Sequence, residues 1–207
     1  DIAAAAAILD TKLATISTAG KVDGAALTGL ASIPAGAGVI PTANVPAGTG
    51  FAQLGETVLA SANNVISVAS FAARKSLIIE LDWPVSSNLN AFDITFNSDV
   101  GANYAVRRST NGAADTTSTA AAAIDSRTST AGSGGQMRMF IDNRSASIKK
   151  VILITMGDNG SGTAPGREEV VGAWNNTAAQ ITTITITGAA GNTFPIGTRM
   201  TVYGPSD

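Results

Sequence analysis

The sequence predicts a mainly β protein: an antiparallel β-sandwich of jelly-roll type, preceded by a short N-terminal helix and an extended stalk rich in glycine and proline. From residue 51 onward, stretches of alternating apolar and polar residues are separated by turn-forming segments. Before residue 51, alanine, glycine and proline dominate. We therefore expect an N-terminal anchoring and stalk region, 1–50, and a β-sandwich head domain, 51–207.

Alternation is clearest at 77–83, 92–97 and 136–142, where every second side chain is apolar and predicts one buried face. The stretch 151–156, VILITM, is apolar on both faces, which predicts a central strand or one covered by a neighbouring subunit. Within 51–207, only residues 114–125 could hold a short helix, and their threonines favour a loop equally. Five further strands are expected at 64–70, 103–108, 168–174, 181–187 and 198–203. The domain would then have about eight or nine strands in all.

The first residues carry an apolar stripe that predicts a helix over 2–17. Ile2, Ala6, Leu9, Leu13 and Ile16 are spaced 4, 3, 4 and 3 residues apart, which is the seam of two heptads. Such a seam packs against another copy of itself as a coiled coil. The alternative is that an alanine-rich helix lays this face on its own domain.

The segment 20–50 combines many glycines and prolines with aliphatic side chains, and we expect it to be extended. A flexible linker would keep its few side chains polar, whereas these aliphatic residues need to be buried, and one extended chain cannot bury them. Copies wrapped around a common axis can; a loosely attached arm is the alternative. The residues predicted to hold copies together are Ile2, Leu9, Leu13, Ile16, Val22, Leu27, Leu30, Ile33, Val39, Ile40 and Val45.

Charge and composition exclude several function classes. The chain has 13 basic and 15 acidic residues without a run of like charge, so we expect no nucleic-acid partner. It lacks cysteine and histidine, which removes thiol and Ser-His nucleophiles and most zinc sites. No stretch of eighteen apolar residues occurs, and we expect no membrane insertion. Because it begins at Asp1, we expect a processed chain or a fragment.

Paired carboxylates are the remaining route to catalysis, and we expect no enzyme. Glu80 and Asp82 share the outer face of one strand, but a solvated strand face shows the same pattern. Glu168 and Glu169 are adjacent and would point to opposite sides of a strand. The loop 156–166 has oxygen ligands suited to calcium, although a tight Asn-Gly turn is the simpler interpretation. We therefore predict no cofactor and no metal.

Four amphipathic aromatic residues could stack on a sugar ring: Trp83, Tyr104, Trp174 and Tyr203. Packing inside the domain is the alternative for each of them. Trp174 is followed by the polar pair Asn175-Asn176, so it is the candidate expected to be exposed and to contact a glycan. Arg107 and Arg108 could bind an anion or a neighbouring carboxylate, but solvation at the surface is the simpler expectation.

Two motifs resemble tailed-bacteriophage virion proteins. GKVDGAALTGLASIPAGAGVIPTANVP, 20–46, is similar to the shaft-like N-terminal sequences of phage fibres. GAWNN, 172–176, followed by ITTITITGAAGNTFPIGTRMTVYG, 181–204, resembles the terminal strands of phage virion domains. The resemblance implies a homotrimeric fibre, or a capsid decoration or spike protein, with an N-terminal stalk and an exposed C-terminal head. It implies no catalytic residue.

Sequence and resemblance together lead to the hypothesis of a structural protein at the surface of a phage particle. Its partners would be two further copies of itself, which closed rotational symmetry accommodates, and other capsid or tail proteins of the virion. The alternative is a carbohydrate-binding adhesin that recognises a host surface glycan.

Overall fold

The structure is a computed structural model that describes residues 50–85, 88–127, 133–159 and 164–206. These residues belong to one compact unit, Pro46–Asp207. The predicted helix 2–17, the predicted extended segment up to residue 49 and all the residues predicted to hold copies together lie outside the described residues.

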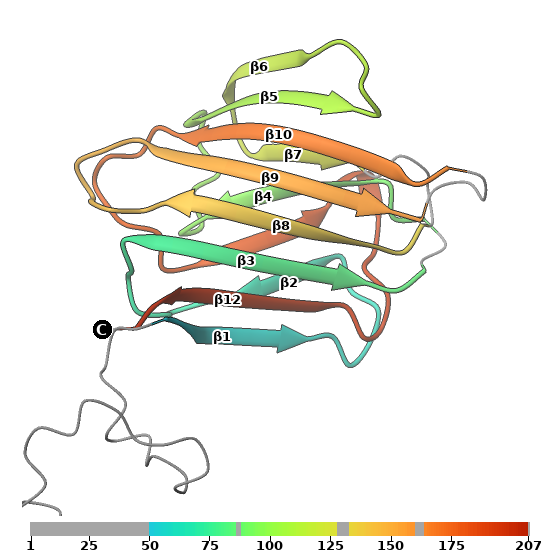
Figure 1. Ribbon diagram of the computed structural model, residues 1–207, viewed down its shortest axis with the longest axis horizontal. Coiled ribbons are helices and arrows are strands. Elements are labelled where there is room, and N and C mark those ends of the chain that lie inside the picture. The colour runs from blue at the N-terminus through green and yellow to red at the C-terminus, as the bar shows by residue number, and fades with distance from the viewer. Residues whose placement is uncertain (1–49, 86–87, 128–132, 160–163, 207) are drawn as a thin grey trace, which may run out of the picture. The chain divides into compact units, whose positions relative to one another are not determined.

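The fold is mainly β, with two antiparallel sheets. The larger sheet has eight strands in the order β1-β12-β3-β8-β9-β10-β5-β6, and every neighbouring pair is antiparallel (Figure 1). Its strands are β1 (Phe51–Val58), β3 (Ser76–Trp83), β5 (Tyr104–Thr110), β6 (Thr116–Ala121), β8 (Gly135–Asp142), β9 (Lys150–Asp158), β10 (Gly166–Trp174) and β12 (Arg199–Pro205).

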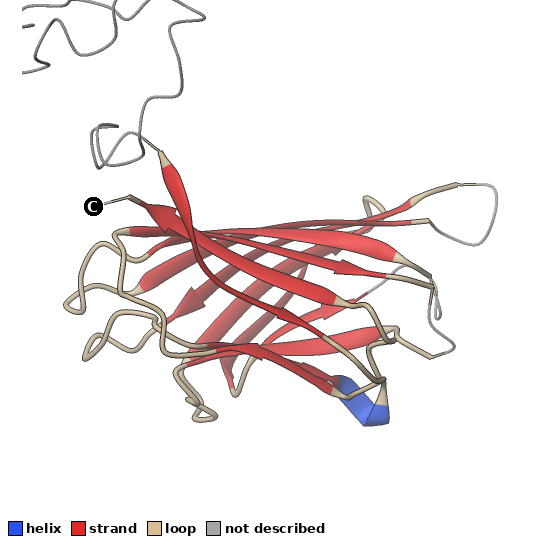
Figure 2. Ribbon diagram, turned by 90° about the horizontal axis from the view of Figure 1, so that it is seen from below, coloured by secondary structure: helices blue, strands red, loops and turns tan. Residues whose placement is uncertain are grey.

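The smaller sheet has four strands in the order β2-β11-β4-β7, again antiparallel throughout. It lies against one face of the larger sheet, so that the domain has two layers (Figure 2). A 3-10 turn, η4 (Ala189–Gly191), follows β11. The strands are β2 (Val65–Val68), β4 (Ala91–Phe96), β7 (Ile124–Arg127) and β11 (Ile184–Gly188).

One hydrophobic core fills the space between the sheets, and the predicted alternation is confirmed. Strand β3 buries Leu77, Ile79, Leu81 and Trp83, and β4 and β8 alternate in the same way. Every stretch expected to form a strand overlaps one in the structure.

The expectation for residues 114–125 is wrong. This stretch forms β6 and the start of β7, with a two-residue turn between them, and contains neither the helix nor the continuous loop. Threonine is β-branched and fits a pleated strand, and β6 is held by β5 along one edge. The strand β1 was also missed, because FAQLGETV has no clean alternation and lies at the other edge of the sheet.

Within the described part of the chain, no helix has the length and apolar character that a membrane span requires.

Candidate functional site

An apolar row crosses the outer face of the eight-stranded sheet, the face turned away from the smaller sheet. It comprises Tyr203, Ile78, Phe140, Leu153 and Val171, each directly opposite the next on neighbouring strands from β12 to β10. Phe140 is 44% exposed, and Leu153 and Val171 are each 49% exposed. The central strands of the sheet therefore present a continuous line of apolar atoms to solvent.

Strand β9 explains why the apolar row exists. It buries Ile152, Ile154 and Met156 on its inner face, while Val151 and Leu153 point outward. The prediction that 151–156 is a central strand is confirmed, since β8 and β10 flank it on both sides. The alternative prediction, that a neighbouring subunit covers it, is compatible with the exposed outer residues and stays a prediction.

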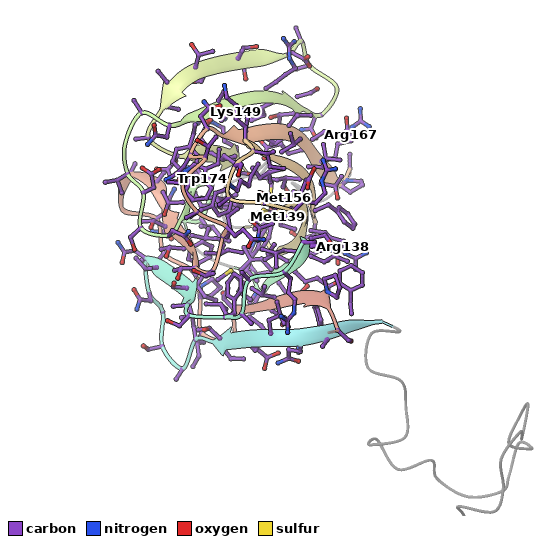
Figure 3. The ribbon with its side chains drawn as sticks, turned by 90° about the vertical axis from the view of Figure 1, so that its left-hand side faces the viewer. Arg138, Met139, Lys149, Met156, Arg167 and Trp174 are labelled. Atoms are coloured by element: carbon purple, nitrogen blue, oxygen red, sulfur yellow. The ribbon has the colours of Figure 1, made fainter. Side chains whose placement is uncertain are left out.

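Arginine–carboxylate pairs surround the apolar row. Arg138 of β8 pairs with Glu80 on β3, and Figure 3 shows Arg138 and Arg167 on the outer side of the larger sheet. In each pair an arginine neutralises a carboxylate on or next to the same strand or a neighbouring one. This face therefore carries positive and negative charges side by side. The others are Arg199–Asp82 at 3.5 Å, Arg167–Glu169 at 3.6 Å, Arg107–Asp115 at 3.1 Å and Arg144–Asp142 at 2.8 Å.

A shallow hollow of about 380 Å³ lies on the same face at β3, β8 and β9, and both candidate catalytic carboxylates line it. Gly157 leaves its floor open, because a Cβ there would have no atom nearer than 3.9 Å. Glu80 is held by Arg138 and Asp82 by Arg199, each on a neighbouring strand. The two carboxylates thus form separate surface ion pairs and do not converge as an acid/base pair.

A second hollow, of about 340 Å³, lies over β9, β10 and β5 at the end of the apolar row. Leu153 and Val171 form its apolar side, and Arg107 and Glu169 form its charged rim. Its mixed lining suits an apolar side chain with a polar surround, which is the anatomy of a protein–protein contact.

A buried polar network joins the two sheets at β5, β7 and β10. The Glu168 carboxylate accepts hydrogen bonds from the Ser126 hydroxyl and from the Arg127 amide at 2.9 Å, and Arg108 lies 3.6 Å away. Arg108 also pairs with Asp125. Burial raises the pKa of Glu168; the hydrogen bonds and the Arg108 charge oppose this shift without cancelling it.

This network corrects one expectation about the arginine pair and bears out another about the glutamates. The side chain of Arg108 is only 14% exposed, so its expected surface solvation is wrong, and the alternative of a neighbouring carboxylate partner is confirmed by Asp125. Arg107 is exposed and also pairs with a carboxylate, that of Asp115. Glu168 is buried and Glu169 points outward, as adjacent strand residues should. The buried arginine was missed because the sequence does not show that β5 and β7 face each other.

The expectation that Trp174 is exposed is wrong. Its ring is fully buried, between the sheets, with its centroid 5.8 Å from that of Phe96 (Figure 3). Its Nε1 donates to Asp99 at 2.9 Å, and the Lys150 ammonium lies 5.4 Å from the ring centroid. Trp174 therefore offers no ring face to a glycan. Val170 and Trp174 are four residues apart on one strand face, so strict alternation from Val170 would have placed the ring inside.

The neighbours of Trp174 are also structural. Lys150 is fully buried and donates to the carbonyls of Ala146, Ile148 and Asn176, and burial lowers its pKa. Burial acts to raise the pKa of Asp99, but hydrogen bonds from Trp174 and from other groups outweigh it and lower that pKa. This corner of the domain is a satisfied polar core with no open site.

The remaining sugar-stacking candidates are buried as well, apart from Tyr203. Trp83 is 3% exposed and donates to the Ser133 carbonyl at 2.8 Å, and Tyr104 is fully buried. Burial raises the pKa of Tyr104 to about 12. Tyr203 is half-buried at one end of the apolar row.

The loop 156–166 is only partly described. Asp158 is buried, and the amide of Asn159 donates to the carbonyl of Gly134 at 3.0 Å. Across the described ranges, no group of three or more Asp and Glu side chains is placed to hold a metal ion.

Comparisons with known proteins add no relative. A scan against protein-family models, a search of curated proteins and a search of solved structures each returned no match. Function therefore has to be argued from the fold, the surface and the sequence motifs.

Proposed function

We propose that this chain is a structural protein of a bacteriophage virion, a homotrimeric fibre or capsid decoration or spike protein at the particle surface, with a jelly-roll head. The structural observation that supports the jelly-roll part of the proposal is the strand order, and the phage-like motifs of the sequence support the virion part. Four strand pairs, β1 with β12, β2 with β11, β3 with β8 and β4 with β7, are nested from the ends of the domain inward.

Such nested pairs arise when a long antiparallel hairpin folds so that its paired strands alternate between two sheets. One sheet contains β1-β12-β3-β8 and the other contains β2-β11-β4-β7, which is the arrangement expected of an eight-stranded jelly roll. The remaining strands β9, β10, β5 and β6 extend the first of these sheets beyond β8. The extension produces the wide outer face that bears the apolar row.

Jelly rolls occur in viral capsid domains, in lectins and in cupins, so the fold alone does not choose among these classes. Cupin-type metal chemistry relies on histidine ligands, and the sequence has no histidine. The lectin or host-adhesin alternative depends on an exposed aromatic residue; its first candidate, Trp174, is buried, and of the other candidates only Tyr203 is partly exposed. The viral structural class agrees with both the fold and the phage-like motifs.

The N-terminal region supplies the argument for a trimer. Its heptad seam and its aliphatic Gly/Pro segment need partner chains to be covered, and the shaft-like resemblance of 20–46 favours three. In this proposal the region 1–50 joins three chains and attaches them to capsid or tail proteins. Three heads then project at fixed spacing, and their weak contacts gain from multivalency.

The mass of the full chain in solution tests the trimer. Three chains of 20.7 kDa give 3 × 20.7 = 62.1 kDa, which light scattering at micromolar concentration should find. A mass of 20.7 kDa, unchanged as the concentration rises, would contradict the proposal.

A further inference from the structure

We infer that the outer face of the eight-stranded sheet is the contact surface between heads, and that its occupant is a second copy of this same chain. The inference deepens the proposed function, since it rests on the homo-oligomer and names the surface that the heads use. It concerns described residues only and does not depend on the structure of the N-terminal region.

The exposure pattern is the first argument. An antiparallel sheet with one solvated face is expected to carry polar residues there, in alternation with the core. β3 and β8 keep this rule near Glu80 and Arg138, but Phe140, Leu153 and Val171 break it on three adjacent strands. A contiguous apolar row with a charged surround marks an interaction site.

Charge decides what kind of partner fits. The five ion pairs around the row are each made of one arginine and one carboxylate, so they add no net charge to the face. A strongly acidic or basic partner would find no complementary patch here. A second copy of this chain is itself close to neutral, with 13 basic and 15 acidic residues, so it can approach this face without net repulsion.

Relief is the third argument. Phe140 and Leu153 are about half exposed, and the hollow that Leu153 and Val171 line offers about 340 Å³. An apolar side chain of a second copy can enter this hollow between Arg107 and Glu169. Phe140 is the largest exposed side chain of the row and is the natural anchor for such a contact.

Thiol accessibility tests the inference on the full-length protein. The chain has no cysteine, so a single substitution reports on one position. Leu153→Cys places a thiol in the row, and Val100→Cys is the matched control at a residue that is 74% exposed in the loop after β4. Both variants are modified with a bulky maleimide in native buffer and in denaturant, while light scattering records the mass.

The expected result is slow modification at position 153 in the assembled protein, at least about tenfold slower than at position 100 after each rate is divided by its rate in denaturant. Dilution to single chains should remove the difference. Equal rates in a species of three chains would overturn the inference and leave the trimer standing. Equal rates in a species of one chain would overturn both.

Protection at position 153 in a species of one chain would also overturn the inference, because residues 1–49 of the same chain would then be the occupant. A second pair of variants addresses the contact itself. Leu153→Glu places a charge in the row and should raise the concentration needed for assembly at least about tenfold, while Val100→Glu leaves it unchanged. Near-UV circular dichroism checks that both variants keep the native fold, and equal assembly by the two would contradict the inference.

Discussion

At the scale of single residues, the polar network around Glu168 links the two sheets without relying on apolar packing. Glu168 lies on β10 of the larger sheet and bonds to Ser126 and Arg127 on β7 of the smaller sheet. Its neighbour Glu169 points to solvent with a side chain that is 61% exposed. Two adjacent glutamates therefore provide a matched comparison of a buried and an exposed carboxylate.

Replacing Glu168 by alanine should destabilise the fold by about 3 kcal/mol, because Arg108 and the Ser126 hydroxyl would lose a buried partner. Glu169→Ala should cost less than about 0.5 kcal/mol, since its ion pair with Arg167 is exposed. Denaturant unfolding of the two variants measures both values. Equal losses would show that Glu168 does not join the sheets.

The pH dependence of stability should also depend on Glu168. Because its pKa is raised in the folded chain, the native state binds this proton more tightly than the unfolded state. Its contribution to the free energy of unfolding is full below the unfolded pKa of about 4.3 and falls as pH rises through the raised folded value. Glu168→Gln should flatten the stability curve above about pH 4. An unchanged slope would contradict the assignment.

At the scale of elements, the end of β11 depends on a close approach of the backbone. A Cβ on Gly188 would lie 2.1 Å from the carbonyl oxygen of Asn192, on the far side of η4. A Cβ on Gly157, which lines the hollow at β3, β8 and β9, would have no other atom closer than 3.9 Å. Only the first of these strand glycines is required by its surroundings.

Gly188→Ala should therefore cost about 3 kcal/mol, because a backbone atom cannot move aside as a flexible side chain can. Gly157→Ala should change stability by no more than about 0.5 kcal/mol and serves as the control. Thermal unfolding measured at one fixed protein concentration compares them. A tolerated alanine at 188 would mean that the η4 turn can shift.

Elements whose two faces differ were predictable from the sequence, and those without such a difference were not. Alternation placed β3, β4 and β8 because half of each strand is apolar. It failed for β6, whose residues Thr116–Ala121 are almost all exposed, and for the edge strand β1. Edge strands contribute little to the core, so their sequences carry little of the period-two signal.

The features of the candidate site divide in the same way into those that the local sequence pattern predicts and those that it does not. The two-sided apolar character of 151–156 predicted a central strand or one covered by a neighbouring subunit; β9 is central, and its outer residues Val151 and Leu153 are exposed. The burial of Trp174 and Arg108 was not predicted, since each depends on which strands from distant parts of the chain face each other. Local polar neighbours such as Asn175 carry no information on that arrangement.

At the scale of the whole molecule, three features stand together: a domain of two antiparallel sheets, an apolar row on its outer face, and an N-terminal region whose aliphatic residues are expected to need partner chains. The proposed assembly into a particle would explain all three features. Under the proposed function, contacts between chains at the particle surface would cover both the exposed apolar row and the aliphatic residues of the Gly/Pro segment.

The most direct test of the central claim is an electron micrograph of phage particles, from the source that encodes this sequence, labelled with gold-conjugated antibody against the head. The account predicts gold at the particle surface, at symmetric capsid or tail positions, and no gold on particles that lack the protein. Intact, infectious particles without the protein in any purified fraction would contradict it.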